Sequence, residues 1–281
     1  MKQKKALKRG ILETIMWIGT LIVFIPYALV LITSFKTCRE AGLFRLTLPT
    51  EWQIVENYKL VFEKGDILLG FKNSILITGV SVALILFSAV MLSYYISRAN
   101  SGSRGRKRFT SWLYIFIVAG MTAPMSLVTT YQLLTGLELI GTKLGVVFIY
   151  CGMLIPFATF IFVGFIKTIP RELDEAAVID GCGPTRLFFT IILPLLKPVT
   201  FTCFILVFMA VWNDAQIILF FLGNSNDWTM PMTIYKFFGY YRADWNLIFG
   251  SVFLTTLPVL IIYLFGQRYI IDGMVAGSIK G

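Results

Sequence analysis

Residues 174–194 read DEAAVIDGCGPTRLFFTIILP and stand apart from the apolar chain around them. A short acidic and alanine-rich segment precedes two glycines, and an apolar run that ends in proline follows them. Of the 281 residues, 57% are hydrophobic and only 14% are charged, whereas a soluble domain carries about 25% charged residues. The composition therefore predicts a membrane protein in which this stretch is a polar interruption.

Six segments outside this stretch are apolar enough to cross a bilayer, for which about 20 residues are needed. They are residues 14–35, 73–97, 109–137, 144–166, 198–222 and 246–267. We read the first as an uncleaved span, because its uncharged run is too long for a signal peptide. We therefore expect an all-α membrane protein with six transmembrane helices, formed by one membrane domain over residues 1–281.

The loop charges predict the orientation of these spans. With a cytoplasmic N-terminus, the inside segments are 1–13, 98–108, 167–197 and the tail from 268. They hold sixteen of the 25 lysines and arginines, as expected for cytoplasmic loops. Both termini are thus predicted to be cytoplasmic, and the net charge of +10 lies beside the membrane and does not indicate nucleic acid.

Two segments are then predicted to lie outside. Residues 36–72 contain Trp52, Tyr58 and Phe62 at roughly helical spacing, which predicts a small amphipathic helix on the outer surface. Residues 223–245 form a polar and aromatic loop before the last span.

The residues that most enzymes need are missing. There is no histidine, the four cysteines are scattered without ligand spacing, and neither a P-loop nor a G-x-S-x-G motif occurs. We therefore expect no catalytic site, no metal and no cofactor on this chain.

Local signals predict a helix over residues 171–180 within the 167–197 loop. Pro170 suits the first turn, three acidic residues favour the N-terminal end of the helix dipole, and Gly181 and Gly183 supply a stop before Pro184. Small side chains on one stripe suit insertion into a groove of another protein: Leu173, Ala176, Ala177 and Asp180. The apolar run after it is too short to span and would pack the helix against the bundle. From these signals alone, a solvated connector remains an alternative.

A sequence pattern adds to this interpretation. The motif E-A-A-x3-G-x9-I-x-L-P is reproduced by Glu175, Ala176, Ala177, Gly181, Ile191, Leu193 and Pro194. It resembles the signature loop of permease subunits in binding-protein-dependent ABC importers. Residues 210–281, which end in AGSIKG, are similar to carbohydrate-uptake permeases of the smaller maltose-permease class.

The resemblance implies a type I ABC importer permease fold and a multi-pass place in the inner membrane of a bacterial or archaeal cell. Residues 171–180 would be the coupling helix that docks on a cytoplasmic ATPase dimer, which would hold the ATP and Mg. The implied coupling residues are Glu172, Leu173, Asp174, Glu175, Ala176, Ala177, Asp180 and Gly181. The other implied partners are a second homologous permease, an extracytoplasmic solute-binding protein and a carbohydrate substrate.

Polar residues inside the fifth span are candidates for substrate contact, because ionisable groups are costly in lipid. Trp212, Asn213 and Asp214 combine an aromatic face with hydrogen-bonding groups, and Gln216 lies close by. In the alternative interpretation, these side chains satisfy neighbouring helices or the partner permease. Met121, Pro124 and Met125 are predicted to interrupt the third span, either beside a cavity or as a structural kink.

Two other functions remain open at this point. A secondary transporter driven by an ion gradient would need ionisable groups deep in several spans, and only Asp214 qualifies. A permease of the same ABC class could also carry a solute that is not a sugar.

Overall fold

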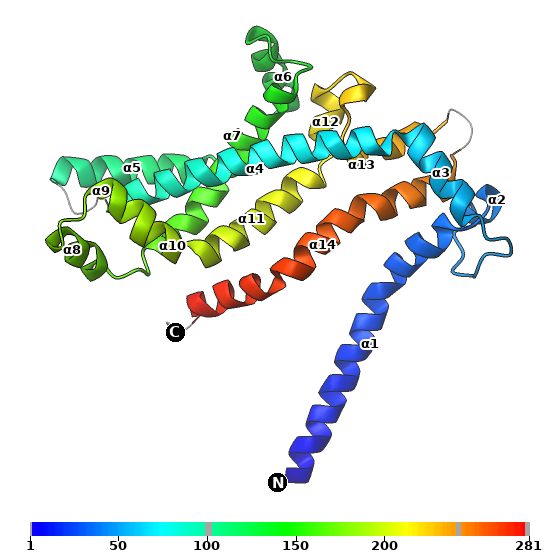
Figure 1. The fold of residues 1–281 in the computed structure, drawn as a ribbon, viewed down its shortest axis with the longest axis horizontal. Helices are drawn as coiled ribbons and strands as arrows, with labels where there is room; N and C mark the ends of the chain where they lie inside the picture. Colours follow the sequence, from blue (N-terminus) through cyan, green and yellow to red (C-terminus); the bar gives the residue numbers. More distant parts are fainter. Residues whose placement is uncertain (1, 99–102, 240–242, 279–281) are drawn as a thin grey trace. The chain divides into compact units, whose positions relative to one another are not determined.

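The computed structural model describes residues 2–98, 103–239 and 243–278. The regular elements in these ranges are helical, and the extended residues pair only in an isolated bridge between Phe238 and Ala243. The predicted all-α class is confirmed (Figure 1). The chain divides into an N-terminal unit, Met1–Leu68 with Met230–Leu257, and a core unit, Leu69–Thr229 with Pro258–Gly281.

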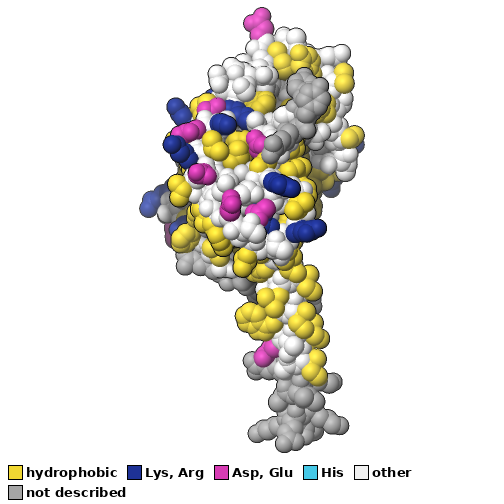
Figure 2. Space-filling view, turned by 90° about the vertical axis from the view of Figure 1, so that its right-hand side faces the viewer, with side chains coloured by type: hydrophobic (Ala, Val, Ile, Leu, Met, Phe, Trp, Pro, Cys, Tyr) yellow, Lys and Arg dark blue, Asp and Glu magenta, His cyan; other side chains and the backbone are white. Residues whose placement is uncertain are grey.

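The N-terminal unit begins with one long helix. Its elements are α1 (Lys2–Ser34), α2 (Cys38–Ala41), α3 (Ile54–Gly65), α13 (Met230–Thr233), the 3-10 helix η4 (Ile234–Phe237) and the first part of α14 (Trp245–Ser278). Large apolar side chains of α1 are exposed from Ile11 to Tyr27, and Figure 2 shows them along the helix. A helix that is apolar and uncovered in this way needs lipid or another protein around it.

Asn57 holds the end of α1 against α3 and α14. Its amide nitrogen donates to the carbonyls of Ser34 and Lys36, each at 2.9 Å, and its oxygen accepts from Asn246 at 2.7 Å. Gly250 lies so close to α3 that an added Cβ would be 3.2 Å from Val61. The buried face of α3 therefore packs on the protein. A helix is present in the predicted segment, as α3, but Trp52 precedes it; its place on the outer surface stays a prediction.

The core unit holds the remaining helices. They are α4 (Ile67–Arg98), α5 (Arg104–Ala119), α6 (Leu127–Gly136), α7 (Lys143–Ile166), α8 (Glu172–Ile179), α9 (Pro184–Arg186), the π-helix η2 (Leu187–Ile192), α10 (Leu193–Leu195), α11 (Lys197–Trp212), α12 (Gln216–Phe221), the 3-10 helix η3 (Ser225–Asp227) and the end of α14.

Helix α7 forms the centre of this unit. It packs along α11, and Phe162, Val163 and Ile166 are fully buried. The Ser93 hydroxyl donates to the Thr159 carbonyl at 3.1 Å, which ties α4 to α7. Within the unit, α8 lies at one end of the helices and α6 and α12 at the other (Figure 1).

Four described helices are long and apolar enough to cross a membrane. They contain Gly10–Ser34, Ile67–Arg98, Lys143–Ile166 and Trp245–Gln267, and match four of the six predicted segments. A pair bent by 70°, Pro184–Leu195 with Lys197–Trp212, would make a fifth. The structure thus supports four or five crossings by length and composition.

The other two predicted segments are broken. The third ends as α5 at Ala119 and resumes as α6 at Leu127, so the stretch with Pro124 is a turn between two helices. The fifth, expected to be continuous, stops at Trp212 and resumes at Gln216. Pro124 in the third segment, and Asn213 and Asp214 in the fifth, therefore lie between helices, where backbone groups are already free of helical hydrogen bonds.

Candidate functional site

Helix α8 is the predicted coupling helix, and it spans Glu172–Ile179. Arg171 and Asp180 are its caps, so the expected range of 171–180 is close. Pro170 lies before the first turn and not within it. Three acidic residues occupy the first turn, where they complement the positive end of the helix dipole.

The helix ends in a Schellman motif. The amide of Cys182 donates to the Ala177 carbonyl at 2.9 Å, and that of Gly181 donates to Val178 at 3.0 Å. Gly181 has φ +78°, a conformation that glycine adopts without the penalty of a Cβ. The predicted glycine stop is confirmed at Gly181, whereas Gly183 has an ordinary φ of −69°.

One side of α8 is fastened to the end of α4. The Arg98 Nε lies 2.8 Å from the Asp174 Oδ2, and the two side chains are only 12% and 18% exposed. The Arg98 guanidinium also donates to the Ile169 carbonyl at 3.4 Å, and Arg171 donates to the Ser97 carbonyl at 3.3 Å. Two arginines therefore link the loop before α8 to the last turn of α4.

Burial raises the pKa of the Asp174 carboxyl group above its ordinary value, and the neighbouring Arg98 and Arg171 act against that rise. Ala177, one turn further on, is buried as well. Asp174 and Ala177 thus face their own chain. Neither is free to meet another protein in this structure, although both belong to the predicted coupling set.

The opposite side of α8 is open. Its exposed residues are Glu172, Leu173, Glu175, Ala176, Val178, Ile179 and Asp180. The predicted stripe is therefore correct for Leu173, Ala176 and Asp180, while Ala177 lies on the inner face. The open face combines three carboxylates with apolar side chains, of which Ile179 is 85% exposed.

The segment after α8 packs on the bundle, as predicted. Phe188 in η2 lies 4.9 Å from the Tyr94 ring of α4, measured between centroids, and Leu187, Phe188 and Ile192 are buried. The sequence did not indicate that this run is a π-helix, a form that is often found at functional sites.

The polar residues of the fifth segment have separate surroundings. Asp214 accepts a hydrogen bond from the Ile217 amide at 2.9 Å and so caps α12. Trp212 is buried, with Phe208 stacked at 5.3 Å and Phe71 edge-on at 6.1 Å. Asn213 and Gln216 are exposed. The break between α11 and α12 thus exposes the side-chain amides of Asn213 and Gln216, while Trp212 and Asp214 stabilise the fold around it.

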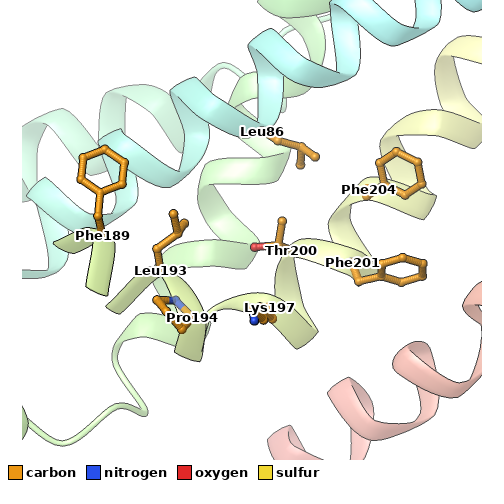
Figure 3. Close-up of a pocket in the computed structure, with 8 residues that line it drawn as sticks. All are labelled: Leu86, Phe189, Leu193, Pro194, Lys197, Thr200, Phe201 and Phe204. Carbon is orange, nitrogen blue, oxygen red and sulfur yellow. The ribbon is translucent and has the colours of Figure 1, made fainter. Parts of the chain in front are cut away.

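Two apolar grooves run between α4 and α11. The larger, of about 570 Å³, is lined by eight residues from α4, η2, α10 and α11 (Figure 3). The other, of about 380 Å³, reaches Trp212. Lys197 and Thr200 are the polar members of the larger lining, whereas a sugar needs several convergent hydrogen-bonding groups. The geometry of these grooves suits packing against apolar groups.

The structure is a bundle of apolar helices that presents a short acidic helix, α8, fastened to the end of α4. Residues 99–272 match the model of a family described as "Binding-protein-dependent transport system inner membrane component". This chain belongs to that family. It is a multi-pass subunit of a transport system in the cell membrane and not an enzyme.

Relatives that match this chain over most of their length are named as transport permeases. It is 32% identical over 271 residues to the probable starch degradation products transport system permease of Thermoanaerobacterium thermosulfurigenes, covering 96% of this chain and 94% of that one. It is 31% identical to the melibiose/raffinose/stachyose import permease of Bacillus subtilis, covering 92% of each.

A solved structure shares the fold. One chain of a bacterial ABC transporter involved in the import of the acidic polysaccharide alginate matches with a TM-score of 0.77 and 18% identity. The match covers 92% of this chain and 95% of that chain. The chain therefore has the fold of an ABC importer permease.

Arg98 is the residue of this site that the sequence did not single out. In the sequence it is one cation of the 98–108 loop among five, and its ion pair joins positions 76 residues apart. A cation at the last residue of a span is a weak signal, since such residues commonly mark the membrane surface.

We predict that Gly181→Ala loosens α8 and that Gly183→Ala does not. An alanine at φ +78° costs about 1 kcal/mol, which corresponds to roughly fivefold faster hydrogen exchange. An added Cβ has open space at both positions, so backbone conformation alone distinguishes the variants. Hydrogen–deuterium exchange of the peptide over residues 172–182 measures the effect; equal exchange in both variants would contradict it.

We further predict that Arg98→Gln leaves the Asp174 carboxylate without its cation, which raises the pKa of that carboxyl further and frees α8. The loss of a hydrogen-bonded charge is worth about 1.5–3 kcal/mol. Exchange of the 172–182 peptide should speed up, and Asp174→Asn in the same chain should restore part of the protection. Arg186→Gln, at an exposed cation of the same loop, is the control. Additive effects of the two substitutions would show that the pair is not coupled.

Proposed function

We propose that this chain is one of two permease subunits of an ATP-driven carbohydrate importer. The observation that carries the proposal is the exposed acidic face of α8, mounted on the end of α4 by Arg98. A transport subunit without an ATP site needs an exposed surface on which an ATPase can bind and through which the movement of that ATPase reaches the membrane helices. The relatives named for starch products, raffinose-type sugars and alginate support a sugar or oligosaccharide as the solute.

In this proposal the whole chain is one membrane domain with six crossings. They are α1, α4, the pair α5 and α6, α7, the pair α11 and α12, and α14. Both termini and the 167–197 loop face the cytoplasm, while residues 36–72 and 223–245 face outward. The distribution of lysine and arginine supports this orientation.

The coupling step uses the exposed residues of α8. Glu172, Glu175 and Asp180 offer negative charge to a cationic groove of the ATPase, and Leu173, Val178 and Ile179 offer apolar contact. Ala176 permits close approach. Asp174 and Ala177 act indirectly, because they hold α8 in register with α4, and Gly181 ends the helix.

Transport then proceeds by alternating access. ATP and Mg bind to the partner ATPase dimer, and closure of that dimer displaces α8. The ion pair between Arg98 and Asp174 passes the displacement to α4. The pathway between this chain and a second, homologous permease opens outward, where a solute-binding protein delivers the sugar. Of the predicted contacts, Asn213 and Gln216 are available to hydrogen-bond a sugar, whereas Trp212 and Asp214 support the break that presents them.

A solute other than a sugar is the second candidate. A chain of the MetNI methionine ABC transporter matches with a TM-score of 0.53 over 74% of this chain. The fold therefore serves more than one class of solute, and the choice depends on the binding protein and partner permease as well as on this chain.

We predict that Glu175→Ala abolishes uptake by the assembled importer and its substrate-stimulated ATP hydrolysis. The carboxylate is exposed, so its removal leaves α8 folded, and exchange of the 172–182 peptide should not change. Glu63→Ala, at an exposed carboxylate of α3, should behave as the native protein. Normal coupled uptake by the Glu175 variant would refute the proposed role of α8.

For the fifth segment, we predict a contrast between adjacent residues. Asn213→Ala should lower sugar uptake while assembly and thermal stability stay unchanged. Asp214→Ala removes the cap of α12 and should cost about 1 kcal/mol of stability, seen as a lower unfolding temperature of the purified complex. Uptake is measured over a panel of mono- and oligosaccharides, and the unfolding temperature is measured beside it. Lower uptake without lower stability indicates a substrate contact, whereas lower stability indicates a structural role. A stability defect in the Asn213 variant would favour a structural role for both.

A further inference from the structure

The leucine-rich loop over residues 42–52, between α2 and α3, exposes several large apolar side chains. Four of its large side chains are more than half exposed: Leu43 57%, Leu46 53%, Leu48 69% and Trp52 58%. Such a concentration in a non-helical segment marks a contact with another apolar phase or partner.

The loop is held in a defined shape at its base. The buried Lys36 amino group donates to the Arg45 carbonyl at 2.6 Å, and the Gln53 amide donates to the Phe35 carbonyl at 2.9 Å. The Thr50 amide donates to Glu40 at 3.2 Å. These bonds hold the backbone of the loop, whose leucine side chains remain exposed.

The base lies at the end of a membrane-crossing helix. The apolar part of α1, Gly10–Ser34, has 25 residues, about 37 Å at 1.5 Å per residue, compared with a hydrocarbon core of about 30 Å. Phe35 and Lys36 follow at once, so the loop begins at headgroup level. The Trp52 ring lies 6.0 Å from that of Phe35, a position typical of the aromatic belt at a membrane interface.

Some neighbouring side chains pack within the N-terminal unit itself. The buried stripe of α3, with Asn57, Val61 and Gly65, faces inward. Phe44 packs edge-on against Trp245 at 4.7 Å between centroids. Other apolar side chains of this unit are exposed as well, among them Val55 at 79%, but Leu43, Leu46 and Leu48 gather in one short loop beside the end of α1.

We propose that the loop over residues 42–52 inserts its leucines into the lipid leaflet at the end of α1 opposite the lysine-rich N-terminus. Leu46 and Leu48 enter the acyl region, Trp52 lies at the carbonyl level, and the exposed Arg45 meets lipid phosphate. Membrane contact of this kind gains with each apolar side chain buried. The loop therefore fixes the height of the N-terminal unit on the bilayer. This inference rests on the membrane location of α1 and not on the solute carried.

The test places nitroxide spin labels on the full chain within its assembled transporter in phosphatidylcholine and phosphatidylglycerol vesicles. The four native cysteines are first replaced, and retained uptake shows that the background is folded. Leu48→Cys and Leu46→Cys carry the label in the loop. Lys59→Cys, on the exposed side of α3, is the matched control. Collision of the label with oxygen, which concentrates in lipid, is compared with collision with a water-soluble nickel chelate.

We expect the ratio of oxygen to nickel collision rates to exceed one at residues 46 and 48 and to fall below one at residue 59. A ratio below one at both loop positions would place the loop in water and overturn the proposal. Protection from both reagents would also overturn it, because the loop would then lie against a protein partner. Normal uptake by the Glu175→Ala variant would refute the proposed role of α8 and would leave this inference standing, because the collision ratio does not depend on coupling to an ATPase.

Discussion

The ion pair between Arg98 and Asp174 joins helix α8 to the end of α4. Helix α8 has eight residues, and an isolated helix of that length is unstable in water. Its structure depends on what it is fastened to. One side is fixed by the buried carboxylate and by Ala177, and the Schellman motif at Gly181 closes its end. A helix anchored on one face leaves the other face available for a partner.

The same contact sets the route by which movement can travel. Arg98 is the last residue of α4, and α4 is tied to α7 by the bond from Ser93 to the Thr159 carbonyl. Phe188 adds a second contact between the α8 segment and α4 through Tyr94. In the proposed mechanism, a force on α8 therefore reaches the membrane helices through the polar contacts of Arg98 and Arg171 and through the aromatic contact of Phe188. Interiors packed this closely transmit displacement because they resist compression.

The sequence was sufficient for features that depend on neighbouring residues along the chain. Helix α8, its acidic first turn and its glycine stop are local, and four long apolar helices follow from hydropathy alone. The inner face of α8 could not be predicted in this way. Whether Ala177 points inward depends on where Arg98 lies, and the two are 79 positions apart. The sequence left open whether Trp212 contacts substrate or packs within the fold, because its contact with the distant Phe71 cannot be read from neighbouring residues.

The break after Trp212 shows how a charge can be placed in an apolar segment. A continuous helix would have left the Asp214 carboxylate in lipid at a cost of several kcal/mol. Breaking the helix instead supplies free amides at the start of α12, and one of them, from Ile217, binds the carboxylate. The polar residue and the interruption therefore stabilise each other. The break also places the side-chain amides of Asn213 and Gln216, which are exposed. In an unbroken helix, the helical periodicity would set the direction of each side chain. A backbone that departs from the helix can instead turn these side chains outward.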